Sequence, residues 1–169
     1  LSNMKKVLSG RNQVCHFWAN KIQSEGRASS MFFEGPSIYS YGHHFEIARF
    51  VKDNVVIFTT RSYSVSTSKH IAYTHRAIPH NVKVFTMPYF TDHKGNIVYM
   101  LQTIDSTFEK AARAIKATEY HLSQIVASAS QIRDYAKEFK VRITKKQEAL
   151  IVKAETCLSE DKLQEVNVK

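Results

Sequence analysis

Residues 45–60 read FEIARFVKDNVVIFTT, and this stretch decides the fold class of the chain. Every second residue from Phe45 to Val51 is Phe, Ile, Arg or Val, a period that fits a strand better than a helical repeat of 3.6 residues. Turn formers follow at residues 52–54, and a β-branched run begins at Val55. The stretch therefore predicts an antiparallel hairpin.

Further strands are predicted on both sides of this hairpin. Two short strands precede it, over residues 31–33 and 38–41, and each is followed by a glycine that marks a turn. Residues 82–101 predict a second hairpin around the turn signal of residues 92–96, which read DHKGN. The predicted fold class is α+β, with an antiparallel sheet of five or six strands packed by short helices and followed by a long C-terminal helix or helical hairpin.

The chain after the first hairpin predicts a helix that starts near a cluster of cations. The N-cap formers around Ser66 precede a run of apolar residues at helical spacing. A helix start offers unpaired N–H groups that favour an anion such as phosphate. Lys69, Tyr73 and Arg76 share one face of this helix, and Arg61 lies just upstream. The alternative is that Ser66 only caps the helix and that the cations form a solvated face.

The period changes again from Asp105 onward, where apolar residues follow a heptad repeat for about five heptads. One helix over residues 105–140 would be about 54 Å long, so it must protrude, break or find a partner. Either the C-terminal helix folds back on it, or two chains pair along it. The residues predicted to form this interface are Phe108, Ile115, Leu122, Ile125, Ile132 and Phe139.

These patterns predict two domains. Residues 1–104 form a β-rich α+β domain, which begins with an amphipathic helix over residues 12–25 that uses Trp18 as a core anchor. Residues 105–169 form a helical arm, made of the long heptad helix and a shorter return helix. The composition, with 43% hydrophobic and 23% charged residues, is that of a folded protein.

Charge and cysteine usage narrow the functional class. The formal net charge is +9, and residues 1–80 hold ten Lys and Arg against four acidic residues, which favours an anionic partner. The apolar runs are far too short to span a membrane, and no apolar core of a secretory signal follows the early lysines. Cys15 and Cys157 have no spacing typical of a disulfide framework, so we expect a cytoplasmic location.

Motifs for catalysis and metal binding are missing. The eight histidines lack the spacing that places two ligands on one helix face, so we predict no metal and no cofactor. The sequence holds no Gly-x-Ser-x-Gly elbow and no phosphate-cradling glycine loop, so no catalytic residue is predicted.

Tyrosines interleaved with cations are the better functional signal. Exposed tyrosines beside Arg and Lys bind single strands by combining base stacking with attraction to the backbone. The alternative is that alternate tyrosines pack the sheet against a helix. The residues predicted to contact nucleic acid are Arg61, Ser66, Lys69, His70, Tyr73, Arg76, Tyr39, Tyr41 and Arg49.

Part of the chain resembles a known family. The words Phe17-Trp18-Ala19-Asn20, Gly35-Pro36-Ser37-Ile38-Tyr39-Ser40-Tyr41-Gly42, Ile47-Ala48-Arg49 and Tyr63-Ser64-Val65-Ser66-Thr67-Ser68-Lys69-His70 resemble a family of small bacteriophage-encoded proteins. The resemblance covers about residues 14–80 and does not include the heptad helix. It implies a phage origin, and hence the host cell cytoplasm, but it brings no activity and no site residue with it.

We therefore expect a phage-encoded, basic, non-enzymatic protein that binds the phosphate backbone of nucleic acid through its β-rich half. A first alternative is an interaction protein, which assembles or captures a virion or host component through the heptad helix. A second alternative is a small phosphodiesterase or nuclease that uses His70 and its neighbours.

Overall fold

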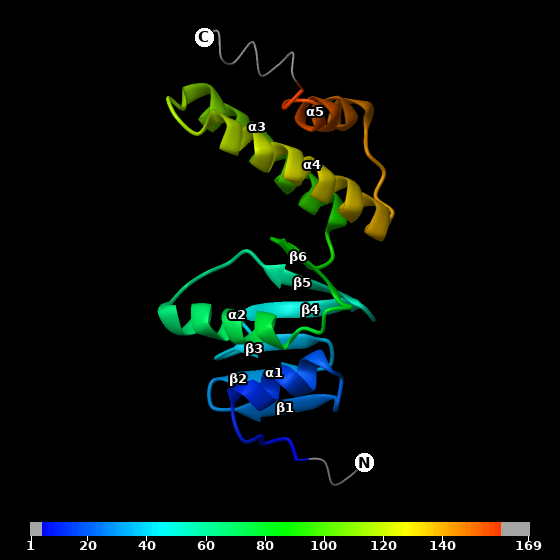
Figure 1. Cartoon of the computed structure of the whole chain (residues 1–169). Helices are drawn as coiled ribbons and strands as arrows, with labels where there is room; N and C mark the ends of the chain where they lie inside the picture. Colours follow the sequence, from blue (N-terminus) through cyan, green and yellow to red (C-terminus); the bar gives the residue numbers. More distant parts are fainter. Residues whose placement is uncertain (1–4, 160–169) are drawn as a thin grey trace. The chain divides into compact units, whose positions relative to one another are not determined.

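A computed structural model describes residues 5–159 and divides the chain into two compact units, Leu1–Thr91 and Asp92–Lys169 (Figure 1). The first unit contains a six-stranded sheet and two helices. Its elements, in chain order, are α1 (Arg11–Ala19), β1 (Glu25–Ala28), β2 (Met31–Glu34), β3 (Ser37–Ser40), β4 (Glu46–Lys52), β5 (Val55–Thr59), α2 (Val65–Ala77) and β6 (Lys83–Met87).

The sheet confirms the predicted α+β class. Its strands lie in sequence order, and each of β1 to β5 pairs antiparallel with the next. The hairpin of β4 and β5 pairs Arg49 with Ile57 and Phe50 with Val56 around the turn at residues 53 and 54. After β5 the chain passes through α2 and returns as β6, which pairs parallel with β5.

Both helices of the first unit pack on the same face of its sheet (Figure 1). Trp18 of α1 is only 2% exposed, contacts Phe50 at 4.9 Å between ring centroids, and donates from Nε1 to the carbonyl of Pro36 at 2.9 Å. The prediction that Trp18 anchors the core is confirmed. His75 of α2 stacks on the buried ring of Phe58, so α2 covers the neighbouring strands.

The second predicted hairpin is wrong in its C-terminal half. Residues 97–101 belong to α3 (His93–Arg113), because Asp92 caps a helix there and its carboxylate accepts from the backbone N–H of Gly95 at 2.8 Å. A Cβ at Gly95 would collide with this carboxylate, so the glycine that suggests a turn instead allows a tight helix cap. The apolar residues Ile97, Met100, Leu101 and Ile104 are buried at helical spacing.

Of the outcomes that the sequence leaves open for a helix over residues 105–140, the structure shows a break. A single helix is replaced by the end of α3 and by α4 (Thr118–Phe139), and Ala117 has a left-handed φ of 66° between them. Helix α5 (Lys145–Glu155) then follows, with a capping box at Thr144 and Gln147. The boundary between the compact units lies after Thr91, whereas the sequence predicts a domain boundary at residue 104, inside α3.

Residues of the predicted heptad interface differ in their burial in the second unit. Leu122, Ile125 and Ile132 are buried in its core, whereas Ile115 lies in the break and is 97% exposed. Phe108 and Phe139 are half-buried.

Arg133 of α4 holds α5 by pairing with Glu148 at 2.6 Å and Glu155 at 2.8 Å. No helix within residues 5–159 is long and apolar enough to cross a membrane.

Candidate nucleic-acid interface

Helix α2 starts two residues earlier than predicted. Ser64, which is in extended conformation, is the N-cap, and its Oγ accepts from the backbone N–H of Thr67 at 3.2 Å. Ser66 is therefore an exposed residue of the first turn, and the prediction that it starts the helix is wrong. The side chain of Ser64 already accepts from one N–H group at the start of α2, so that group is not available to an anion.

Three predicted residues come together on α2 and are joined there by a fourth. Lys69, Tyr73 and Arg76 follow one another at intervals of four and three residues, which places them on one helix face. The guanidinium of Arg76 lies over the Tyr73 ring at 5.0 Å from its centroid, and Arg11 of α1 approaches the same ring at 5.9 Å. We call Arg11, Lys69, Tyr73 and Arg76 the arginine–tyrosine face.

Among residues 5–159, the cations of the arginine–tyrosine face have no acidic partners. The N-terminal unit has only four acidic residues, and each pairs with another side chain: Glu25 with Lys6, Glu34 with His43, Glu46 with Arg49 and Asp53 with Lys21. In the described part of the chain, no carboxylate pairs with Arg11, Lys69 or Arg76. The face therefore keeps a local positive charge that only solvent or a ligand can neutralise.

Arg61 forms a second, smaller cluster in the loop before α2. Its guanidinium lies over the rings of Phe45, at 5.2 Å, and Tyr63, at 5.1 Å. It also donates to the Tyr63 hydroxyl at 2.5 Å and to the carbonyl of His44 at 3.3 Å. Arg61 is exposed, so it stays accessible to an anion while the aromatic rings hold it in place.

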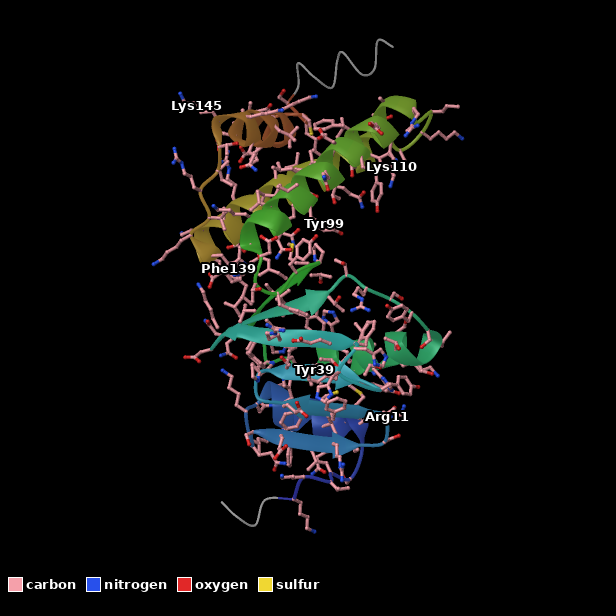
Figure 2. All side chains as sticks on the ribbon, turned by 180° about the vertical axis from the view of Figure 1, so that it is seen from behind. Arg11, Tyr39, Tyr99, Lys110, Phe139 and Lys145 are labelled. Carbon is pink, nitrogen blue, oxygen red and sulfur yellow. The ribbon has the colours of Figure 1, made fainter. Side chains whose placement is uncertain are left out.

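Two other predicted residues lie on the opposite face of the sheet. Ser40 contacts α2, so the alternation along β3 directs its neighbour Tyr39 to the other face, where Tyr39 stacks on Phe32 at 4.9 Å (Figure 2). Arg49 makes two hydrogen bonds of 2.7 Å to the Glu46 carboxylate, so its charge is already compensated. The structure therefore does not bring Tyr39 and Arg49 together with the arginine–tyrosine face.

His70 is buried beneath the arginine–tyrosine face and is not part of its exposed surface, which differs from its predicted role as a surface contact. Its side chain is fully buried between α2 and the sheet, with Ser40 Oγ 2.7 Å from Nδ1 and Ser30 Oγ 3.1 Å from Nε2. Burial, together with the nearby Arg11 guanidinium, lowers the pKa of His70 from its ordinary value of 6.5. Tyr41, which is 57% exposed, places its ring 5.3 Å from the His70 ring and stays accessible at the surface.

Arg11 is the residue that sequence reasoning misses. It is the first residue of α1 and lies 59 positions from His70, which its Nη1 approaches to 3.5 Å. No local pattern indicates this contact, because it depends on α1 and α2 packing side by side.

Within residues 5–159, no group of three or more His, Cys, Asp or Glu side chains is arranged to hold a metal ion. Comparison of the chain with family models, with curated proteins and with solved structures gives no match.

Proposed function

We propose that the N-terminal unit binds the phosphate backbone of a nucleic acid through the arginine–tyrosine face. The observation that carries this proposal is that, among the described residues, no carboxylate forms an ion pair with Arg11, Lys69 or Arg76, while Arg11 and Arg76 both lie against the ring of Tyr73. Such a group attracts phosphates by charge and offers a ring on which a base can stack.

Side-chain chemistry favours nucleic acid over a generic anion. Arginine is the cation that stacks on aromatic rings and matches phosphate with two parallel N–H groups. Arg11 and Arg76 both lie against Tyr73, so their guanidinium groups are oriented before any ligand arrives. Orientation in advance reduces the conformational entropy that binding would otherwise cost.

The contacts on this face position a strand without reading its sequence. Phosphate contacts carry no base information, and stacking on tyrosine tolerates every base. The proposal is therefore a sequence-tolerant binder with a preference for accessible bases, as in single strands. The phage origin implied by the resemblance stays a prediction.

The alternative of assembly through the heptad helix has less support. Leu122, Ile125 and Ile132 already pack inside the second unit and are at most 5% exposed. An interface that used them would first have to open that core.

Charge reversal tests the proposal. Arg76→Glu should abolish binding of labelled single-stranded oligonucleotides at low salt, measured by fluorescence anisotropy. Lys52→Glu is the matched control, because it changes the net charge equally at the exposed end of β4. An equal loss in both variants would show that only total charge matters and would contradict the proposed face.

A further inference from the structure

His70 has a hydroxyl on each side of its ring. Ser40 Oγ lies 2.7 Å from Nδ1, and the residue Ser40 is 1% exposed. Ser30 Oγ lies 3.1 Å from Nε2, and the residue Ser30 is half-buried. Ser30 lies in the turn after β1, Ser40 in β3 and His70 in α2. The fold therefore brings the three residues together from distant parts of the chain. We call Ser30, Ser40 and His70 the histidine centre.

Neighbouring groups decide which ring nitrogen carries the proton. Arg11 Nη1 lies 3.5 Å from Nε2, and a guanidinium has only donors, so Nε2 is favoured as the bare, accepting nitrogen. Nδ1 then carries the hydrogen and donates to Ser40 Oγ. The bare Nε2 is left to accept the hydroxyl hydrogen of Ser30. This arrangement has the order of nucleophile, base and orienting group that activates a serine.

Two residues that flank Ser30 have left-handed backbone. Ser29 and Tyr41 have left-handed φ values of 56° and 65°, and the N–H of Tyr41 donates to the carbonyl of Ser30 at 2.6 Å. A left-handed residue is usual in a two-residue hairpin turn, such as that of Ser29 and Ser30 between β1 and β2. The two residues hold Ser30 in the turn beside His70.

A ligand can reach Ser30 from one side. A groove of about 620 Å³ is lined by Ser30 together with Arg27, Tyr41 and His43. This volume is in the usual range for small-molecule sites. Ser40, at 1% exposed, lies on the closed side of His70, so only Ser30 is placed to meet a substrate.

We propose that Ser30 is a catalytic nucleophile, with His70 as its general base, and that its substrate is a phosphate ester. The choice of phosphate rests on the proposed function, because Arg11 belongs both to the arginine–tyrosine face and to the surroundings of His70. Ser40 is a positioning residue, since it acts only through the His70 ring.

The reaction balances without a metal or redox partner. Ser30 Oγ attacks phosphorus while its proton passes to His70 Nε2. The bond between phosphorus and the leaving alcohol breaks, and the alcohol oxygen takes the proton from His70. Water then attacks phosphorus and gives a proton to His70, the bond from phosphorus to Ser30 Oγ breaks, and His70 returns the proton to Oγ. Arg11 Nη1 lies 3.5 Å from His70 Nε2 and so puts a positive charge beside the reacting groups.

Covalent trapping tests the nucleophile independently of nucleic-acid binding. The full chain is treated with a fluorophosphonate, whose P–F bond is replaced by a P–O bond to an activated serine, and adducts are mapped by mass spectrometry. We expect one adduct, on Ser30, that is lost in Ser30→Ala and kept in the matched control Ser68→Ala, which removes an exposed hydroxyl from α2. A folded parent without this adduct overturns the proposal.

Further variants test the roles of base and orienting group. His70→Gln should slow labelling about 100-fold or more, the usual contribution of a general base. If His70→Gln does not fold, Ser40→Ala still tests the centre, because loss of the Nδ1 acceptor should slow labelling and alter its pH profile. Because the pKa of His70 is lowered from 6.5, the parent rate should rise with pH only below 6.5 and be constant above it. Labelling of Ser30 that is indifferent to pH and to Ser40→Ala overturns the role of His70.

Substrate class is tested with bis(p-nitrophenyl) phosphate and p-nitrophenyl acetate. Turnover of the diester that is lost in Ser30→Ala supports the phosphate assignment, whereas turnover of the acetate alone overturns it. An unlabelled Ser30 in a protein that still binds oligonucleotides overturns this inference and leaves the proposed function standing. A labelled Ser30 in a protein that binds none overturns the proposed function and the phosphate assignment with it.

Discussion

Arg76 lies one helical turn from Tyr73 with its guanidinium 5.0 Å from the ring centroid, and Arg11 of α1 approaches the same ring at 5.9 Å. One tyrosine thus orients cations from two helices. Each such contact is worth roughly 0.5–1 kcal/mol at an exposed site. This energy is small for folding, but it holds two guanidinium groups against one ring.

Removing the Tyr73 ring should weaken binding of single strands. Tyr73→Ala should cost about 1–3 kcal/mol of binding free energy, because base stacking is lost together with the orientation of both arginines. Tyr73→Phe keeps the ring and is the matched control, so its affinity should stay close to that of the parent. Fluorescence anisotropy with oligonucleotides measures both. Equal affinities for the Ala and Phe variants would show that the ring has no part in binding.

Two isoleucines of the predicted heptad repeat should respond in opposite ways to the same substitution. Ile125 is 0% exposed and Ile115 is 97% exposed. Ile125→Asp should cost about 3–5 kcal/mol of the free energy of unfolding, because it leaves an unpaired charge in the core. Ile115→Asp should change stability by no more than about 0.5 kcal/mol. Chemical denaturation measures both, and a large loss in Ile115→Asp would contradict the break between α3 and α4.

Docking of α5 on α4 should weaken in acid. Arg133 lowers the pKa values of Glu148 and Glu155 below their ordinary 4.5. A lowered pKa in the folded state gives stability that is present above pH 4.5 and is lost as pH falls through the folded values. The stability difference between the parent and Arg133→Ala should therefore be constant between pH 5 and 7 and shrink as pH falls below 4.5. A difference that does not shrink below pH 4.5 would contradict the pairing.

His70 should titrate below the range of an exposed histidine. Burial and Arg11 lower its pKa from 6.5, so the unfolded chain takes up a proton first as pH falls. Stability should accordingly decline as pH drops below about 6.5, down to the lowered folded value. NMR titration of the histidine ring protons should give His70 a midpoint below the ordinary histidine value of 6.5. A midpoint at or above 6.5 would contradict the burial of His70.

The parts of the fold that local patterns determine could be predicted from sequence. The period of two from Phe45 and the turn at Asp53 and Asn54 sufficed for the β4–β5 hairpin. The run 97–101 was ambiguous, because short apolar runs suit strands and helices alike and the deciding group is the Asp92 cap. The break near Ala117 has no glycine or proline to announce it, so the heptad repeat appeared continuous.

Some residues of the candidate site could likewise be predicted from local sequence, and others could not. Lys69, Tyr73 and Arg76 belong to one helix, so their spacing alone predicted a shared face. Arg11 and Ser30 join this region only through tertiary packing, and no spacing in the sequence reveals such contacts. Tyr39 was assigned to the site because it is close in sequence, but strand alternation directs it to the opposite face.

Salt dependence of binding tests the central claim most directly. Affinity of the parent and of Lys69→Ala is measured on single-stranded and duplex oligonucleotides across a range of salt concentrations. If Lys69 neutralises one phosphate, the log–log salt slope should fall by about 0.9 on duplex DNA and about 0.7 on a single strand, with all sequences weakened alike. A parent that does not bind at low salt, or a Lys69→Ala variant with unchanged affinity and slope, would contradict the arginine–tyrosine face as a phosphate-binding site.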